Sequence, residues 1–116
     1  MGAFTEAAHE VSPQRAAELL GSGEAEVIDV REPYEREAGF IEGTRHVPLE
    51  HIASQAQTLD RGRPVVFHCR LGARSGMVTQ AFRAAGYDAY NMEGGIQAWA
   101  DSGLPLSPDG GYVADH

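Results

Sequence analysis

The chain has 116 residues and a formal net charge of -8, from nine basic and seventeen acidic residues. This length suits a single domain with its own hydrophobic core. The acidic balance excludes nucleic acid and anionic lipid as favoured partners, because both would be repelled. No apolar run approaches the ~20 residues of a membrane span, and no basic segment followed by an apolar stretch opens the chain. We therefore expect a cytoplasmic protein without membrane contact.

The first half of the chain predicts two strands separated by helical segments. Ser12-Pro13 has the chemistry of a helix start, and Gly21 should end that helix. The β-branched run 26–30 predicts a buried strand. Residues 32–43 are interrupted by proline and glycine and should hold one helical turn between loops. A short strand closed by proline is predicted at 45–48.

The second half continues the alternation of helices and strands. Apolar residues recur with helical spacing from Leu49 to Leu59 and predict a helix there. The remaining predicted elements are, in chain order, a strand at 65–68, a helix ended by Gly86, a strand at 88–92 and a helix followed by Gly103. Short buried strands between helices indicate an α/β fold, with a parallel sheet covered on both faces. Ligands bind beyond the carboxyl ends of the strands in such folds.

Cys69 is the only cysteine, and it lies where the strand 65–68 ends and a loop begins. A thiol between a buried strand and a following helix lies near several backbone N–H groups, an arrangement that favours an anion. Arg70 and Arg74 flank the thiol, so we predict a largely ionised and reactive cysteine. The alternative is a small buried hydrophobe. Because no second cysteine is present, a group acquired by Cys69 must leave to something outside the chain.

The loop residues have different predicted roles. Gly72 permits backbone angles that let successive N–H groups turn toward one atom. Arg74 is expected to act at the site, whereas the side chain of Arg70 could lie either there or in solvent. Ser75 can cap the following helix through its hydroxyl. The candidate substrate-binding residues are therefore Arg70, Leu71, Gly72, Ala73, Arg74 and Ser75.

Two charged residues close the first buried strand and are expected behind the loop rather than in it. For Asp29 we favour a structural role, bonded to loop amides or to an arginine, over direct catalysis. Arg31 should pair with Glu35 or Asp29 rather than with substrate. His68 is interpreted as a satisfied structural histidine, and Trp99 as a core residue. No set of His, Cys and acidic residues has metal-ligand spacing, so neither a metal nor another cofactor is expected.

Three ordered segments of the chain resemble the signatures of the rhodanese sulfurtransferases. The first comprises residues 29–31, 34–35, 39–43 and 46–48, the second is the Cys69 loop with Arg74 five positions on, and the third is 94–105 around Trp99. Phe40 and Thr44 stand where that family usually has histidine and alanine. The resemblance covers roughly residues 8–106, which we predict to be one rhodanese domain. Flexible ends are predicted at 1–7 and 107–116.

The resemblance implies a three-layer rhodanese fold, in which a central parallel sheet of about five short strands has helices on both faces. It also implies a thiosulfate sulfurtransferase in which sulfane sulfur passes through a Cys69 persulfide to cyanide or a cellular thiol. The expected partners are then a small-molecule sulfur donor and acceptor. An acceptor protein is left open as a further partner.

Three other functions compete with sulfur transfer to a small molecule. A non-catalytic binding module of this fold and a protein-partnered sulfur carrier both stay open. A phosphatase or arsenate reductase is disfavoured, because those enzymes close a longer Cys-x5-Arg loop around a tetrahedral oxyanion. Here Ser75 stands six positions after Cys69, and the shorter loop should suit one sulfur atom.

Overall fold

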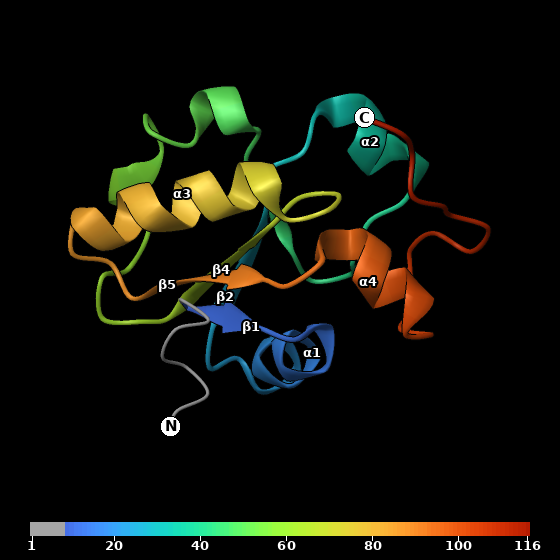
Figure 1. Cartoon of the computed structure of the whole chain (residues 1–116), viewed down its shortest axis with the longest axis horizontal. Coiled ribbons are helices and arrows are strands. Elements are labelled where there is room, and N and C mark those ends of the chain that lie inside the picture. Colours follow the sequence, from blue (N-terminus) through green and yellow to red (C-terminus); the bar gives the residue numbers. More distant parts are fainter. Residues whose placement is uncertain (1–8) are drawn as a thin grey trace.

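A parallel sheet of five strands forms the centre of the protein, and the computed structural model describes residues 9–116 around it (Figure 1). The strands lie in the order β1-β5-β4-β2-β3, and every neighbouring pair is parallel. They are β1 (Glu10–Val11), β2 (Glu26–Asp29), β3 (Arg45–His46), β4 (Val65–His68) and β5 (Ala89–Met92). The predicted α/β fold is confirmed. The end predicted to be flexible at 1–7 lies outside the described residues.

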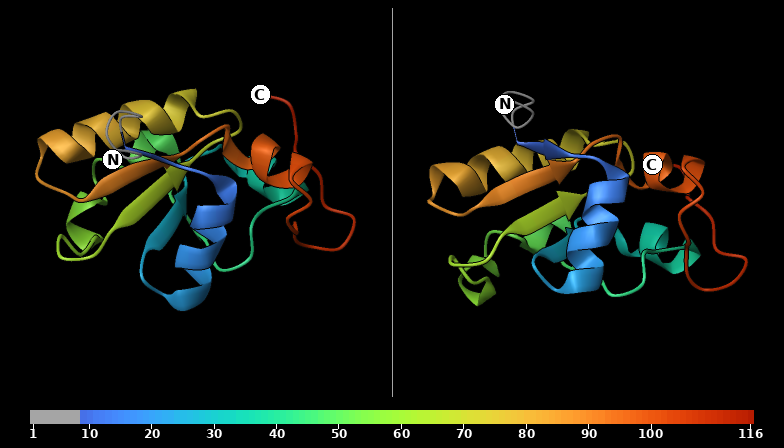
Figure 2. Two further views of the ribbon diagram at one scale, coloured as in Figure 1. Left: turned by 60° about the horizontal axis from the view of Figure 1, so that its bottom comes forward. Right: turned by 90° about the horizontal axis from the view of Figure 1, so that it is seen from below.

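Helices cover both faces of the sheet (Figure 2). On one face lie α1 (Pro13–Ser22) and α4 (Gly95–Asp101), and on the other lies α3 (Ala73–Ala84). The central strand β4 supplies both cores, because Phe67 packs with the α3 side and Val66 with the α1 and α4 side. This burial on both faces explains why β4 is a continuous apolar run. Among the described residues, no helix has the length and apolar character needed to cross a membrane.

One predicted helix is wrong. The apolar spacing from Leu49 to Leu59 is realised as two short 3-10 helices, η1 (Leu49–His51) and η2 (Ala56–Thr58). Pro48 precedes the segment and provides no side-chain cap for a helix. At the other end of the segment, Arg45 Nη2 donates a hydrogen bond to Thr58 Oγ1 at 2.7 Å. Short 3-10 pieces of this kind serve as connectors. The buried apolar side chains of the segment are Ile52 and Leu59, which directly follow the two pieces.

Smaller differences concern the ends of elements. The first helix runs past the predicted end at Gly21 to Ser22, and Gly23, with a φ of 77°, caps it. Strand β1 has only two residues, too few to show a periodic pattern, and it was not predicted. The equally short β3 was predicted only because Pro48 marks the end of its segment. The short helix α2 (Pro33–Ala38) corresponds to the helical turn expected between 32 and 43.

Residues 107–116 run back along α2, and the carboxyl end of the chain lies beside that helix (Figure 1). Phe40 and Ser107 pair through two backbone hydrogen bonds of 2.9 and 2.8 Å, and the Tyr112 amide donates to the Ala38 carbonyl at 3.0 Å. Gly39 permits this approach, since a Cβ there would lie 2.5 Å from the Tyr112 carbonyl oxygen. Flexibility of this segment stays a prediction, but its course brings it to the carboxyl edge of the sheet.

Candidate active site

Cys69 lies directly beyond the carboxyl end of β4, a central strand of the sheet. Ligands of parallel sheets bind at this edge. The residue is only 1% exposed and belongs to the apolar cluster under α3. It nevertheless lines a pocket of about 280 Å³, together with Arg70, Leu71, Ala73, Arg74 and His116. The thiol is therefore buried, but it lies at the base of a pocket.

Polar groups converge on the Cys69 sulfur. The Gly72 amide donates to Sγ at 3.1 Å and the Ser75 amide at 3.5 Å, while the Ser75 hydroxyl oxygen lies 3.3 Å from Sγ. Gly72, with a φ of 112°, begins the turn into α3. The first N–H groups of a helix have no partner inside the helix, so they stabilise negative charge placed beside them. The sulfur therefore occupies a site suited to a thiolate.

The other side of the loop is held by α4. The amides of Ile96 and Gln97 donate to the carbonyl oxygens of Cys69 and Arg70 at 2.9 and 3.1 Å. Because these carbonyls point toward α4, their oxygens do not place negative partial charge beside the sulfur. Gly95, with a φ of 63°, makes the approach possible. A Cβ there would lie 2.6 Å from the Cys69 carbonyl oxygen and closer still to that of Arg70.

A chain of side-chain hydrogen bonds lies behind Ser75. The Ser75 hydroxyl oxygen lies 2.6 Å from Asn91 Oδ1, and Asn91 Nδ2 donates to Glu10 at 3.0 Å and to the Gly72 carbonyl at 3.1 Å. Glu10 and Gly72 both present acceptors, so they fix the amide of Asn91 with its oxygen toward Ser75. Sequence reasoning missed Asn91 and Glu10. For Asn91, its position near the carboxyl end of the predicted strand 88–92 is the signal that could have found it. Glu10 lies beside Asn91 on the neighbouring strand β1, and no sequence signal marked it.

Both loop arginines are paired with carboxylates. Arg74 makes two hydrogen bonds to the buried Glu35, of 2.8 and 3.0 Å, and Arg70 Nη2 donates to Asp115 at 3.2 Å. Sequence reasoning placed the arginines near the thiol but assigned neither carboxylate to them. The pocket therefore carries less uncompensated positive charge than the sequence around Cys69 suggests.

The Glu35–Arg74 pair is charged at neutral pH. Burial acts to raise the pKa of Glu35, but hydrogen bonds from Arg74 and from the Glu32 amide, together with the Arg74 charge, hold it below its usual value. Burial acts to lower the pKa of Arg74, yet the bonds and charge of Glu35 raise it. The pair joins α2 to the first turn of α3, and losing one partner would leave the other charge poorly solvated.

Asp29 and Arg31 form a buried pair behind the loop. Arg31 donates to the two carboxylate oxygens of Asp29 at 2.9 Å each, and to the Gly39 carbonyl at 2.8 Å. Of the two partners expected for Arg31, the structure therefore shows Asp29. Burial acts to raise the pKa of Asp29, but the charges of His68 and Arg31 and the bonds from Arg31 hold it well below its usual range. The pair ties β2 to the segment after α2.

His68 is buried next to this pair, and burial lowers its pKa. Its Nδ1 lies 3.3 Å from the Cys69 carbonyl oxygen. Its Nε2 has no hydrogen-bond partner within residues 9–116, and it lies 4.0 Å from Asp29 Oδ1. The expectation of a satisfied histidine therefore holds for one ring nitrogen only.

Two neighbouring features complete the site. A second pocket, of about 410 Å³, shares Arg74 and His116 with the first. Glu32, Glu35 and His116 place one ligand atom each within 4.8 Å of one another, the spacing of a metal site. Both Glu35 oxygens are already bound by Arg74, so we interpret the group as hydrogen-bonded side chains and not as a metal site.

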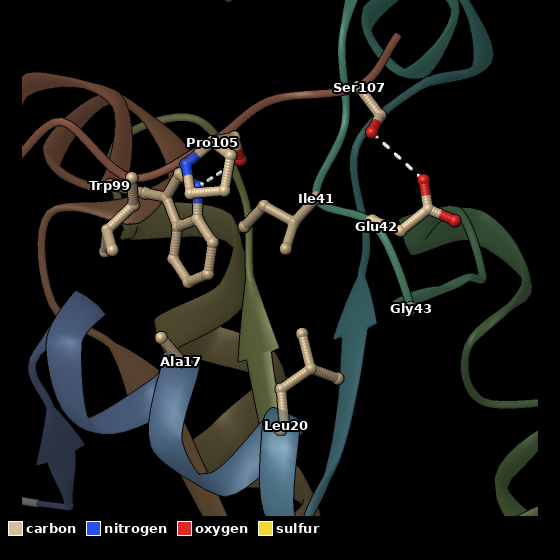
Figure 3. Close-up of a pocket in the computed structure, with 10 residues that line it drawn as sticks. Ala17, Leu20, Ile41, Glu42, Gly43, Trp99, Pro105 and Ser107 are labelled. Atoms are coloured by element: carbon tan, nitrogen blue, oxygen red, sulfur yellow. Dashed lines mark hydrogen bonds between the residues drawn. The ribbon is translucent and has the colours of Figure 1, made fainter.

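A larger pocket, of about 450 Å³, lies between α1, α4 and the segment around Ile41 (Figure 3). Apolar side chains make most of its wall, including Ala17, Leu20, Ile41 and Trp99. Its polar groups are paired with one another. Trp99 Nε1 donates to the Pro105 carbonyl at 2.7 Å, and the Ser107 hydroxyl donates to Glu42 at 3.0 Å. Cys69 does not line this pocket, so we place the chemistry in the smaller one.

Comparison with known proteins identifies one family. The profile of the rhodanese-like domain matches residues 12–102. The uncharacterized protein YqhL of Bacillus subtilis is 38% identical over 80 residues, which are 68% of this chain and 64% of YqhL. The chain thus spans less than two thirds of that relative. The thiosulfate sulfurtransferase GlpE of Pseudomonas aeruginosa is 31% identical over 90 residues, or 77% of this chain and 81% of GlpE.

A solved structure agrees with these relatives. The crystal structure of a rhodanese-related protein from Thermoplasma volcanium has a TM-score of 0.78 and 26% sequence identity to this chain. The match covers 85% of this chain and 97% of that one. The arrangement of sheet and helices is therefore that of a known fold.

Substituting Gly95 by alanine should disrupt the loop. Alanine would meet the carbonyls of Cys69 and Arg70 at a positive φ, so we expect the free energy of unfolding to fall by about 3 kcal/mol and iodoacetamide to modify Cys69 at a changed rate. Gly103→Ala is the matched control, because Gly103 has a φ of 81° but a Cβ there would meet no atom within 4 Å. Equal losses in both variants, with unchanged alkylation, would contradict this account of α4.

Replacing Glu35 by glutamine should destabilise the fold in a pH-dependent way. The native pKa of Glu35 lies below its ordinary value of 4.5, so its ionisation stabilises the fold above that value and the contribution is lost as pH falls further. We expect Glu35→Gln to lower the free energy of unfolding by about 2 kcal/mol at pH 7, and by less near pH 4. Denaturant titrations at both pH values measure this, with the exposed Glu37→Gln as control. A difference that is constant with pH would rule out the ion pair as its cause.

Proposed function

Because the chain belongs to the rhodanese-like domain family, we propose that it is a sulfurtransferase that carries sulfane sulfur on Cys69. The observation that carries the proposal is the Cys69 sulfur itself, held by the amides of Gly72 and Ser75 at the base of a pocket. The relative GlpE is a thiosulfate sulfurtransferase by name, which supports sulfur transfer in general. We further propose that thiosulfate is the sulfur donor and that a Cys69 persulfide is the intermediate.

In the first step, the Cys69 thiolate attacks the outer sulfur of thiosulfate. A sulfur–sulfur bond forms to Cys69, the bond between the two thiosulfate sulfurs breaks, and its electron pair leaves with sulfite. The enzyme then carries a persulfide anion. The same amides, with the partial positive charge at the start of α3, stabilise the sulfur anion before and after the step.

In the second step, a thiophilic acceptor attacks the outer sulfur of the persulfide. Cyanide leaves as thiocyanate, and a thiol leaves as a new persulfide, and in both cases Cys69 returns to the thiolate. A low-molecular-weight thiol and a protein thiol are both acceptors that this chemistry allows. The absence of a second cysteine in the chain means that the acceptor must come from outside.

The remaining loop residues shape the pocket in this proposal. Leu71 is 59% exposed and forms part of the rim, and Ala73 lines the wall. Arg70 and Arg74 present guanidinium groups to the pocket, each already compensated by a carboxylate. We therefore propose that these two arginines orient the oxyanion of the donor and contribute little to its affinity.

Intact-mass measurement after incubation with thiosulfate tests the proposal. We expect the protein to gain the mass of one sulfur atom, to lose it on addition of cyanide, and to release thiocyanate. Cys69→Ser should gain no sulfur. Parallel assays with an aryl phosphate serve as the control for the phosphatase alternative. Sulfur uptake by Cys69→Ser, or phosphate release that exceeds thiocyanate formation, would overturn the proposal.

A further inference from the structure

The end of the chain reaches the mouth of the Cys69 pocket. Asp115 accepts a hydrogen bond from Arg70 through its side chain, at 3.2 Å, and one from the Tyr34 hydroxyl through its carbonyl, at 3.0 Å. His116 lines the pocket, and its Nε2 lies 3.3 Å from Glu32 Oε2. The match to the rhodanese-like profile ends at residue 102. These contacts are therefore supplied by a segment that lies outside the match.

The two arginines of the pocket are compensated in different ways. Arg74 pairs with Glu35, whose side chain is fully buried, so that pair is part of the fold. Arg70 pairs with Asp115, whose side chain is 97% exposed, while that of Arg70 is 26% exposed. Arg70 Nε is buried and has no hydrogen-bond partner within the described residues. The guanidinium of Arg70 thus retains a free donor, and within residues 9–116 the carboxylate that pairs with it is exposed.

We propose that Asp115 is a positioning residue that acts through Arg70 and weakens the preference of the pocket for dianionic sulfur donors. This inference rests on the proposed sulfurtransferase function and adds a determinant of donor class to it. An anion approaching Cys69 and the carboxylate of Asp115 compete for the same guanidinium. With Asp115 in place, the pocket discriminates less between dianionic and monoanionic sulfane donors.

The size of the effect follows from the exposure of the pair. An exposed ion pair contributes at most a modest interaction, because water and salt screen it. Removing the carboxylate should therefore change the KM for a dianion by about two- to fivefold, and not by orders of magnitude. The effect should be smaller for a donor that carries less charge, and it should also decrease when salt is added. It should leave kcat unchanged, because the amides that hold the Cys69 sulfur are untouched.

The test compares Asp115→Asn with Asp109→Asn in the full chain. Both variants remove one negative charge from the same segment, but Asp109 is exposed and makes no hydrogen bond or ion pair among residues 9–116. Two sulfane donors are assayed with cyanide: thiosulfate with two charges and methanethiosulfonate with one. We expect Asp115→Asn to lower the KM for thiosulfate more than that for methanethiosulfonate. Asp115→Glu should restore the original values.

A second readout does not depend on sulfur transfer. Iodoacetate and iodoacetamide alkylate the same thiol and differ in charge, so the ratio of their rates on Cys69 reports the potential at the pocket. We expect Asp115→Asn to raise this ratio about two- to fivefold at low salt, and Asp109→Asn to leave it unchanged.

The two readouts separate failure of the inference from failure of the function. A raised alkylation ratio without sulfur uptake from any donor would support the role of Asp115 in setting the pocket potential and refute the sulfurtransferase. An unchanged alkylation ratio, or equal shifts in the Asp115→Asn and Asp109→Asn variants, would overturn the inference even if sulfur transfer is found. A KM change that is the same for both donors would also overturn it.

Discussion

Two hydrogen bonds from the start of α4 determine the shape of the Cys69 loop. They hold the carbonyl oxygens of Cys69 and Arg70 on the α4 side, while the amides of Gly72 and Ser75 face the sulfur. The close approach requires glycine at position 95, where any Cβ would collide with the loop. The chemistry proposed for Cys69 thus depends on packing between the Cys69 loop and the start of α4, which are distant in sequence.

Charge compensation organises the rest of the site. In an acidic chain, each cation near the thiol has a carboxylate partner: Arg74 has the buried Glu35, and Arg70 has the exposed Asp115. Burial makes the first pair a structural brace between α2 and α3, while exposure leaves the second open to competition by an anion. Stability and donor preference are therefore assigned to different arginines.

Local sequence patterns predicted the sheet, most helices and the place of Cys69, because strand ends, caps and glycines act over a few residues. Contacts between distant segments could not be predicted in this way. Arg74 and Glu35 are 39 positions apart, and Arg70 and Asp115 are 45 apart, with no periodicity to link them. The segment from Leu49 to Leu59 shows the converse limit, because helical spacing of apolar residues fits short 3-10 turns equally well.

A crystal structure of the protein loaded with sulfur from thiosulfate tests the central claim most directly. We predict an outer sulfur on Cys69 within hydrogen-bond distance of the amides of residues 71–75, with the carbonyls of Cys69 and Arg70 still bound to Ile96 and Gln97. An outer sulfur that contacts apolar side chains alone, or loop carbonyls released from α4, would contradict the account.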